Sequence, residues 1–170
     1  MTLPTSTHYD KLIARAQTLE PAFCAIAHPC DEPSLSAALE ARDLGLLHPI
    51  LVGPEKKIRD TAAQFKLNLG DARIVDVPHS HAAAETAVAL VRNGEATLLM
   101  KGSLHTDELM HEVVARTTGL RSGRRISHVF IMEVPTYAEP LFITDAAINI
   151  FPDLETVSYT HLTLPTSDLV

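Results

Sequence analysis

The sequence predicts an α/β fold with a mostly parallel sheet and helices on both of its faces. Short apolar runs such as residues 22–28 (AFCAIAH) and 49–53 (PILVG) are typical of strands covered on both faces, as in parallel sheets. Segments with apolar residues at steps of three and four lie between these runs and predict helices. Because the two kinds of segment alternate along the chain, we expect crossover helices joining parallel strands.

The composition excludes several classes of protein. The chain has 170 residues, of which 46% are hydrophobic and 21% charged, enough for the core of one domain or of one and part of a second. A net charge of −7 argues against a nucleic-acid partner, since the basic residues are scattered apart from one short cluster at Arg121, Arg124 and Arg125. No apolar run approaches the ~20 residues of a membrane span, so we expect no membrane partner.

The first ten residues, MTLPTSTHYD, contain no apolar signal core, and we expect a cytoplasmic protein. Cys24 and Cys30 lie six positions apart, which matches no common zinc spacing. In a reducing compartment a disulfide between them is not expected.

The individual elements follow from the same patterns. We expect helices at 9–19, 55–65 and 82–91, the last ending at Gly94, one from a cap at Ser34 to Gly45, and one through the periodic residues between 106 and 117. We expect strands at 22–28, 49–53, 72–77, 96–100, 125–134 and 141–150.

The turn Lys101-Gly102-Ser103 ends the apolar run 96–100 and precedes a helical pattern. Free N–H groups at a helix start attract anions, Lys101 adds a full charge, and Gly102 lets a ligand approach the main chain. In open parallel sheets ligands gather at the carboxyl ends of strands, where this turn is expected. The alternative is that Ser103 or Thr106 only caps the helix, with the acidic pair 107–108 matching its dipole.

Other motifs and polar side chains give weaker evidence of a functional site. The sequence has no GxGxxG fingerprint, and in the turn the lysine precedes the glycine, unlike a nucleoside-triphosphate loop. His79 and His81 lack a nearby carboxylate set, so we expect no metal. Asp145 lies in an apolar run with Asn149 four residues on, and either pairs structurally or lines a cleft.

Three stretches, in order, resemble the phosphate acetyltransferase and phosphate butyryltransferase family. They are LLMKGSLHTDELM (98–110), GLRSGRRISHVFIMEVP (119–135) and LFITDAAINIFPDLET (141–156), and the earlier segment 25–54 is similar to the opening strand-helix-strand of that family. The resemblance covers about residues 9–156. It implies a fold like that of isocitrate and isopropylmalate dehydrogenases, two α/β domains flanking a cleft.

The resemblance also implies a reaction. Family members interconvert an acyl-CoA plus phosphate with an acyl phosphate plus free CoA, so CoA is a substrate and no bound cofactor is expected. Carried onto this sequence, the phosphate side of the cleft comprises Lys101, Gly102, Ser103 and Thr106. Arg121 in GLRSG is a candidate guanidinium clamp, since its planar fork matches phosphate oxygens.

The same resemblance places His105, Asp145 and Asn149 on the cleft wall. The family is about twice this length, and its catalytic residues belong to a second half with no counterpart here. We therefore expect residues 9–156 to be the N-terminal part of a phosphate acyltransferase, truncated before the second half, and residues 157–170 to be a disordered tail foreign to the family. The full-length protein is expected to be a homo-oligomer.

Three alternatives stay open at this point. One is a non-catalytic module that binds an acyl phosphate or a CoA ester. Another is an NAD-dependent decarboxylating dehydrogenase, against which the missing metal-binding aspartate cluster counts. The third is an α/β domain whose turn is only a helix cap. Within the family, the HTDELM and GLRSG stretches favour the butyryl branch.

Overall fold

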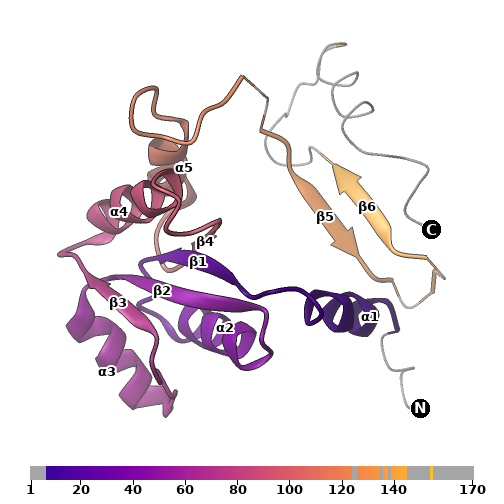
Figure 1. Ribbon diagram of the computed structural model, residues 1–170, viewed down its shortest axis with the longest axis horizontal. Helices are drawn as coiled ribbons and strands as arrows, with labels where there is room; N and C mark the ends of the chain where they lie inside the picture. Colours follow the sequence, from indigo (N-terminus) through magenta and orange to yellow (C-terminus); the bar gives the residue numbers. More distant parts are fainter. Residues whose placement is uncertain (1–6, 124–125, 135, 138, 145–153, 155–170) are drawn as a thin grey trace. The chain divides into compact units, whose positions relative to one another are not determined.

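The computed structural model describes residues 7–123, 126–134, 136–137, 139–144 and 154. It divides into two compact units, one of residues 13–122 and one of residues 1–12 with 123–170. Along the chain (Figure 1) the elements are α1 (Thr7–Ala16), β1 (Ala22–Ala27), α2 (Glu32–Asp43), β2 (Leu47–Gly53), α3 (Glu55–Phe65), β3 (Arg73–Asp76), α4 (Ser80–Arg92), β4 (Leu98–Lys101), α5 (Thr106–Val114), β5 (Val129–Met132) and β6 (Leu141–Thr144).

The unit of residues 13–122 is built on a four-stranded sheet in the order β3-β2-β1-β4. All three pairings are parallel, with Ala27 opposite both Val52 of β2 and Lys101 of β4. The chain leaves β1 toward β2 and β3, then returns through α4 to place β4 on the other side of β1. This confirms the predicted parallel α/β sheet.

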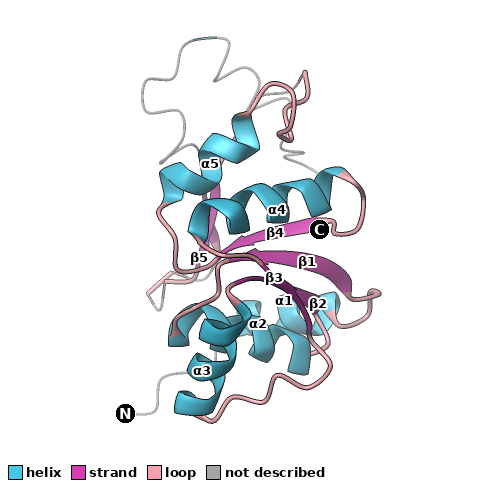
Figure 2. Cartoon of the chain, turned by 90° about the vertical axis from the view of Figure 1, so that its left-hand side faces the viewer, coloured by secondary structure: helices cyan, strands magenta, loops and turns pink. Residues whose placement is uncertain are grey.

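Helices cover both faces of this sheet, as predicted (Figure 2). On one face α4 and α5 enclose a cluster that includes Ala25, Val52 and Val88. On the other face α2 and α3 enclose Ile26, Leu51 and neighbouring residues. Because residues 24–27 of β1 are all buried, β1 is covered on both faces. This is the physical reason for its unbroken apolar run.

Several helix ends differ from the prediction. Helix α2 begins at Glu32, and Asp31, not Ser34, is its cap, because Asp31 Oδ1 accepts a hydrogen bond from the Ser34 N–H at 3.1 Å. Pro33 lies within the first turn, where a helix tolerates proline, so the helix starts before it. The predicted stops at Gly45 and Gly94 are confirmed, since both have positive φ angles, of 73° and 78°.

The second unit contains an antiparallel pair, β5 and β6, with Val129 opposite Thr144 and Met132 opposite Leu141. None of its described residues is buried. The predicted strands at 125–134 and 141–150 are found over the shorter ranges of β5 and β6. Residues 145–150 and the expected tail at 157–170 lie outside the described residues.

Cys24 and Cys30 are both free thiols in the structure, and Cys24 is a buried core residue. Among the described helices, none is long and apolar enough to cross a membrane.

Candidate functional site

The carboxyl ends of β1 and β4 meet at the point where the strand order reverses. Ala27 and Lys101 end these two strands in register. At such a switch point the outgoing connections diverge to opposite faces of the sheet and leave a crevice that ligands occupy. The predicted turn at residues 101–103 lies here, beside residues 28–30, which follow β1.

Gly102 is buried against the end of β1. Its N–H donates to the Ala27 carbonyl at 2.8 Å. A Cβ at this position would lie 2.5 Å from the Ala27 oxygen and 2.6 Å from the His28 oxygen. The main chain of Ala27 and His28 already occupies the space that a Cβ would need, whereas from the sequence we expected this glycine to admit a ligand. The small residue instead allows the two strand ends to approach closely.

Ser103 is hydrogen-bonded to the same segment. Its N–H donates to the His28 carbonyl at 2.8 Å. Its hydroxyl also donates to that carbonyl, at 2.8 Å, and accepts from the Cys30 N–H at 3.2 Å. Neither Ser103 nor Thr106 caps α5, since the N-cap position is His105 and it makes no side-chain capping bond. The helix-cap alternative is therefore wrong for these two side chains.

The amino group of Lys101 folds back over the turn. Its Nζ donates to the carbonyls of Gly102 at 3.1 Å and Leu104 at 2.9 Å. An ammonium group has three N–H donors, so one stays available. The positive charge is thus held at the end of β4, next to the start of α5.

The first turn of α5 follows at once. His105 and Thr106 are exposed, and the turn has no side-chain cap. Its N–H groups and their partial positive charge can therefore bind an anion. Asp107 and Glu108 lie in the same turn and reduce that attraction.

Arg121 is placed differently from the other candidates. It is exposed, and it follows a segment fastened to the carboxyl end of α5, because the Leu120 N–H donates to the Val113 carbonyl at 2.9 Å. Thr106 begins α5, whose length is about 12 Å from first to last residue. The structure therefore bonds Gly102 and Ser103, between Lys101 and the start of α5, to residues 27–30, whereas the main chain at Arg121 starts from the other end of the helix.

Two further candidate residues, Asp145 and Asn149, lie outside the described residues. His79 caps α4, since its Nδ1 accepts a hydrogen bond from the Ala82 N–H at 3.2 Å. In the part of the chain that the structure describes, no group of three or more His, Cys, Asp and Glu side chains is arranged for a metal ion.

Cys30 adjoins the site but is unsuited to nucleophilic chemistry. Burial raises the pKa of its thiol to about 11, with a smaller raising effect from Asp31 and an opposing one from Lys57. A thiol of this kind stays protonated near neutral pH and reacts slowly.

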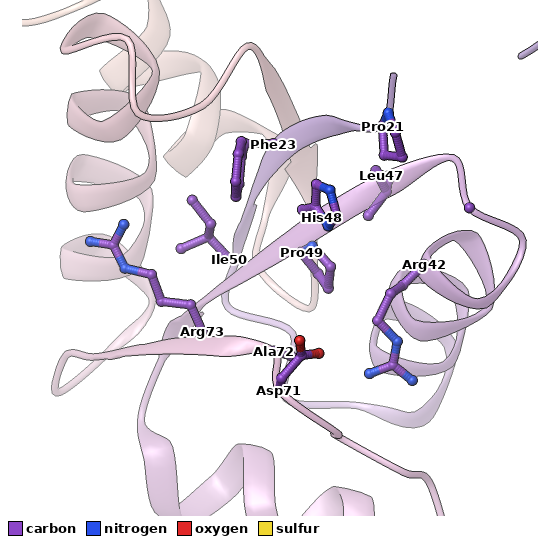
Figure 3. Close-up of a pocket in the computed structure, with 11 residues that line it drawn as sticks. Pro21, Phe23, Arg42, Leu47, His48, Pro49, Ile50, Asp71, Ala72 and Arg73 are labelled. Carbon is purple, nitrogen blue, oxygen red and sulfur yellow. The ribbon is translucent and has the colours of Figure 1, made fainter. Parts of the chain in front are cut away.

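A cavity of about 430 Å³ lies at the opposite, amino-terminal edge of the sheet (Figure 3). Its two arginines are already paired. Arg42 donates to the carbonyls of Leu69 at 2.7 Å and Asn68 at 3.0 Å, and Arg73 bonds Glu95 at 3.0 Å. The candidate site is therefore the carboxyl edge of the sheet and not this cavity.

Sequence reasoning missed one residue that contacts the turn, His28. It follows β1 directly, is half-buried and has a positive φ of 56°. Its ring Nδ1 lies 3.1 Å from the Ser103 hydroxyl and 3.2 Å from the Ser103 carbonyl. The available signal was a histidine that ends an apolar strand immediately before a proline.

Comparison with known proteins identifies the family of the chain. A family model described as "Phosphate acetyl/butaryl transferase" matches residues 78–163, which include β4, the turn and α5. The chain belongs to the phosphate acetyl/butyryltransferase family. The predicted resemblance is thereby confirmed.

Members of the family are similar over most of this chain. A phosphate acetyltransferase of Rhizobium meliloti is 67% identical over 147 residues, which are 86% of this chain and 46% of the relative. One of Rickettsia felis is 47% identical, over 87% of this chain and 42% of the relative. A phosphate butyryltransferase of Clostridium beijerinckii is 35% identical, over 88% of this chain and 50% of the relative.

Solved structures with the same fold include a branched-chain phosphotransacylase from Enterococcus faecalis V583, with a TM-score of 0.63 at 23% identity, covering 81% of this chain and 48% of that one. The EutD phosphotransacetylase from Staphylococcus aureus has a TM-score of 0.63 at 17% identity, covering 88% of this chain and 53% of that one. The chain spans about half the length of the relatives it matches.

Proposed function

We propose that this chain supplies the phosphate-facing wall of an acyltransferase that moves an acyl group between coenzyme A and inorganic phosphate. The observation that supports the proposal is the family match over residues 78–163. This segment contains both the uncapped start of α5 and Lys101, whose Nζ donates to the Leu104 carbonyl at 2.9 Å just before that helix. The reaction is acyl-CoA + HPO₄²⁻ ⇌ acyl phosphate + CoA, in which the phosphate proton passes to the thiol.

The residues divide into two groups by their contacts. Gly102 and Ser103 build the turn, because their N–H groups are bonded to the carbonyls of Ala27 and His28. Thr106, the first-turn N–H groups of α5 and the remaining N–H of Lys101 are the groups that hold the phosphate oxygens. They orient the phosphate and offset its charge, and orientation of this kind supplies much of the catalysis of acyl transfer.

The relatives favour an acetyl group. Identity to the Rhizobium meliloti acetyltransferase is 67%, against 35% to the Clostridium beijerinckii butyryltransferase. We therefore propose acetyl-CoA as the substrate, in place of the butyryl preference read from the HTDELM and GLRSG stretches.

The two free thiols suit the reducing cytoplasm as the compartment of the reaction. The full-length enzyme is proposed to be a homo-oligomer.

Phosphate titration of the chain tests the proposal. We expect inorganic phosphate, added at constant ionic strength, to shift the backbone amide resonances of residues 106–108. Thr106→Val is expected to weaken binding by about tenfold to a hundredfold, since a hydrogen bond to a charged group contributes about 1.5–3 kcal/mol. Thr97→Val, at the exposed amino end of β4, is the matched control. Unchanged spectra up to about 50 mM phosphate would remove the site.

A turnover assay tests whether this chain contains the catalytic groups of the reaction or only the proposed phosphate site. With acetyl-CoA and phosphate, the chain alone is expected to release little or no CoA. Turnover at the rate of an ordinary enzyme, about 10 s⁻¹, would show that the catalytic groups lie within these residues.

Arg121 is tested separately because its main chain starts from the far end of α5. In the full-length enzyme, we propose that Arg121→Ala raises the KM for phosphate or acyl phosphate. An unchanged KM would remove Arg121 from the site.

A further inference from the structure

His28 is held in an uncommon conformation by the turn after β4. Its φ of 56° is in the left-handed region, which few non-glycine residues adopt. Its carbonyl accepts three hydrogen bonds, from the N–H groups of Cys30 at 2.9 Å and Ser103 at 2.8 Å and from the Ser103 hydroxyl at 2.8 Å. Strained main-chain positions of this kind persist only where surrounding contacts determine them, and they concentrate at functional sites.

The contacts of Ser103 favour one tautomer of the His28 ring. Nδ1 lies 3.2 Å from the Ser103 carbonyl, which can only accept a hydrogen bond, so this contact is satisfied when Nδ1 carries the proton. The Ser103 hydroxyl proton is already donated to the His28 carbonyl, which leaves this oxygen as a second acceptor for Nδ1–H, at 3.1 Å.

The hydrogen bonds of the Ser103 hydroxyl use all of its donor and acceptor positions. It donates once, to the His28 carbonyl, and accepts from the Cys30 N–H and from His28 Nδ1–H. A hydroxyl has one proton and two lone pairs, so none is left for a ligand.

The other ring nitrogen, Nε2, is available. Within the described residues it has no hydrogen-bond partner, and it is not among the buried side-chain atoms that lack one. Nε2 is therefore reached by solvent. In the neutral ring its lone pair is a hydrogen-bond acceptor, held at the switch point by the clamp on Nδ1.

We propose that His28 is a further residue of the phosphate site, where Nε2 accepts a hydrogen bond from the P–OH group of HPO₄²⁻, and that Ser103 is its positioning residue. The inference rests on the proposed function. N–H donors at the start of α5 and on Lys101 suit the unprotonated oxygens of this ion, whereas its single hydroxyl needs an acceptor. Among the side chains described at the two strand ends, the ring of His28 supplies a neutral one.

The tautomer can be measured without any substitution. In the ¹⁵N-histidine-labelled full chain, long-range ¹H–¹⁵N spectra of the neutral His28 ring are expected to show the proton on Nδ1 and none on Nε2. Titration with inorganic phosphate is expected to shift the Nε2 resonance more than the Nδ1 resonance. A ring with its proton on Nε2 before phosphate is added would overturn the inference.

Two substitutions separate the ring nitrogens. Asn tolerates a positive φ and places an amide N–H near the position of Nδ1, so His28→Asn keeps the clamp and removes Nε2. We expect it to weaken phosphate binding about threefold to tenfold with an unchanged unfolding midpoint. His28→Gln, which places its amide near Nε2, is expected to retain more binding. His48→Asn, at the exposed amino end of β2, is the matched control.

The outcomes distinguish this inference from the proposed function. If phosphate shifts the residue 106–108 amides but neither the Nε2 resonance nor the affinity of His28→Asn changes, the His28 inference fails and the proposed function stands. If phosphate moves none of these resonances, both fail.

Discussion

Gly102 shows at the scale of one residue how the site is constructed. The oxygens of Ala27 and His28 occupy the space where its Cβ would lie, and both belong to the main chain, which cannot move aside as a flexible side chain can. The glycine is therefore needed for the approach of β4 to β1 and hence for the position of every group in the turn.

We predict that Gly102→Ala destabilises the chain by about 1–3 kcal/mol, the usual cost of overpacking, and displaces the turn. The free energy of unfolding from urea denaturation measures the cost. Gly123→Ala, where a Cβ would meet nothing within 4 Å, is the control and is expected to change stability by less than about 0.5 kcal/mol. Equal stabilities of the two variants would contradict the packing argument.

The two cysteines make stability depend on alkaline pH. Burial raises the pKa of each thiol from 9.0 to about 11. Between these values the unfolded chain loses thiol protons that the folded chain retains, so the free energy of unfolding falls as the pH rises from 9 to 11. Urea midpoints at pH 8 and pH 10 measure the fall. A variant with both cysteines replaced by alanine is expected to lose less stability over this interval, and an equal loss would refute the prediction.

At the scale of elements, helix starts are stabilised by residues outside the helix. Pro54, the N-cap of α3, makes no side-chain capping bond. Asp76, the last residue of β3, supplies the acceptor instead, because its Oδ1 lies 2.8 Å from the Glu55 nitrogen. This bond joins α3 to β3 across 21 positions of sequence.

We predict that Asp76→Ala costs about 1 kcal/mol, the usual cost of a lost cap, whereas Asp76→Asn costs less because it keeps an oxygen acceptor. Asp60→Ala, which removes the exposed i,i+4 pair with Lys56, is the control and should cost less than about 0.5 kcal/mol. Chemical denaturation of the three variants compares them. If Asp76→Ala matches the control, the cross-strand cap contributes nothing measurable.

The difference between prediction and structure is greatest at these element ends. The apolar periods predicted the helices and strands of residues 22–114 to within a few positions, including residues 55–65, which match α3. The caps at Asp31, His79 and Asp76 were not predicted, because several polar residues near each start could serve and only the folded geometry selects one.

At the scale of the whole molecule, stability is concentrated in one unit. The buried hydrophobic residues that the structure describes lie between Cys24 and Leu109, all within the unit of residues 13–122. The described residues of the other unit contribute none, and β5 and β6 are a two-stranded pair with exposed Phe130, Ile131 and Phe142. Such a pair has little stability of its own.

We predict that a fragment of residues 13–122 unfolds cooperatively in urea, with a free energy of unfolding within about 0.5 kcal/mol of that of the full chain. Ile26→Ala, in the core against α2 and α3, is expected to cost about 2–5 kcal/mol in both the fragment and the full chain. A fragment that is unfolded, or much less stable than the full chain, would show that the second unit supports the first.

The sequence by itself determined the parallel α/β sheet, the alternation of its elements and the family, because apolar periodicity and ordered motifs are local properties of the chain. Tertiary structure decided which groups of the turn are free. The N–H groups of Gly102 and Ser103 and the Ser103 hydroxyl are occupied by residues 27–30, more than 70 positions earlier, and His28 enters the site through the same contacts. Hydrogen-bond saturation depends on such distant partners, which no local pattern specifies.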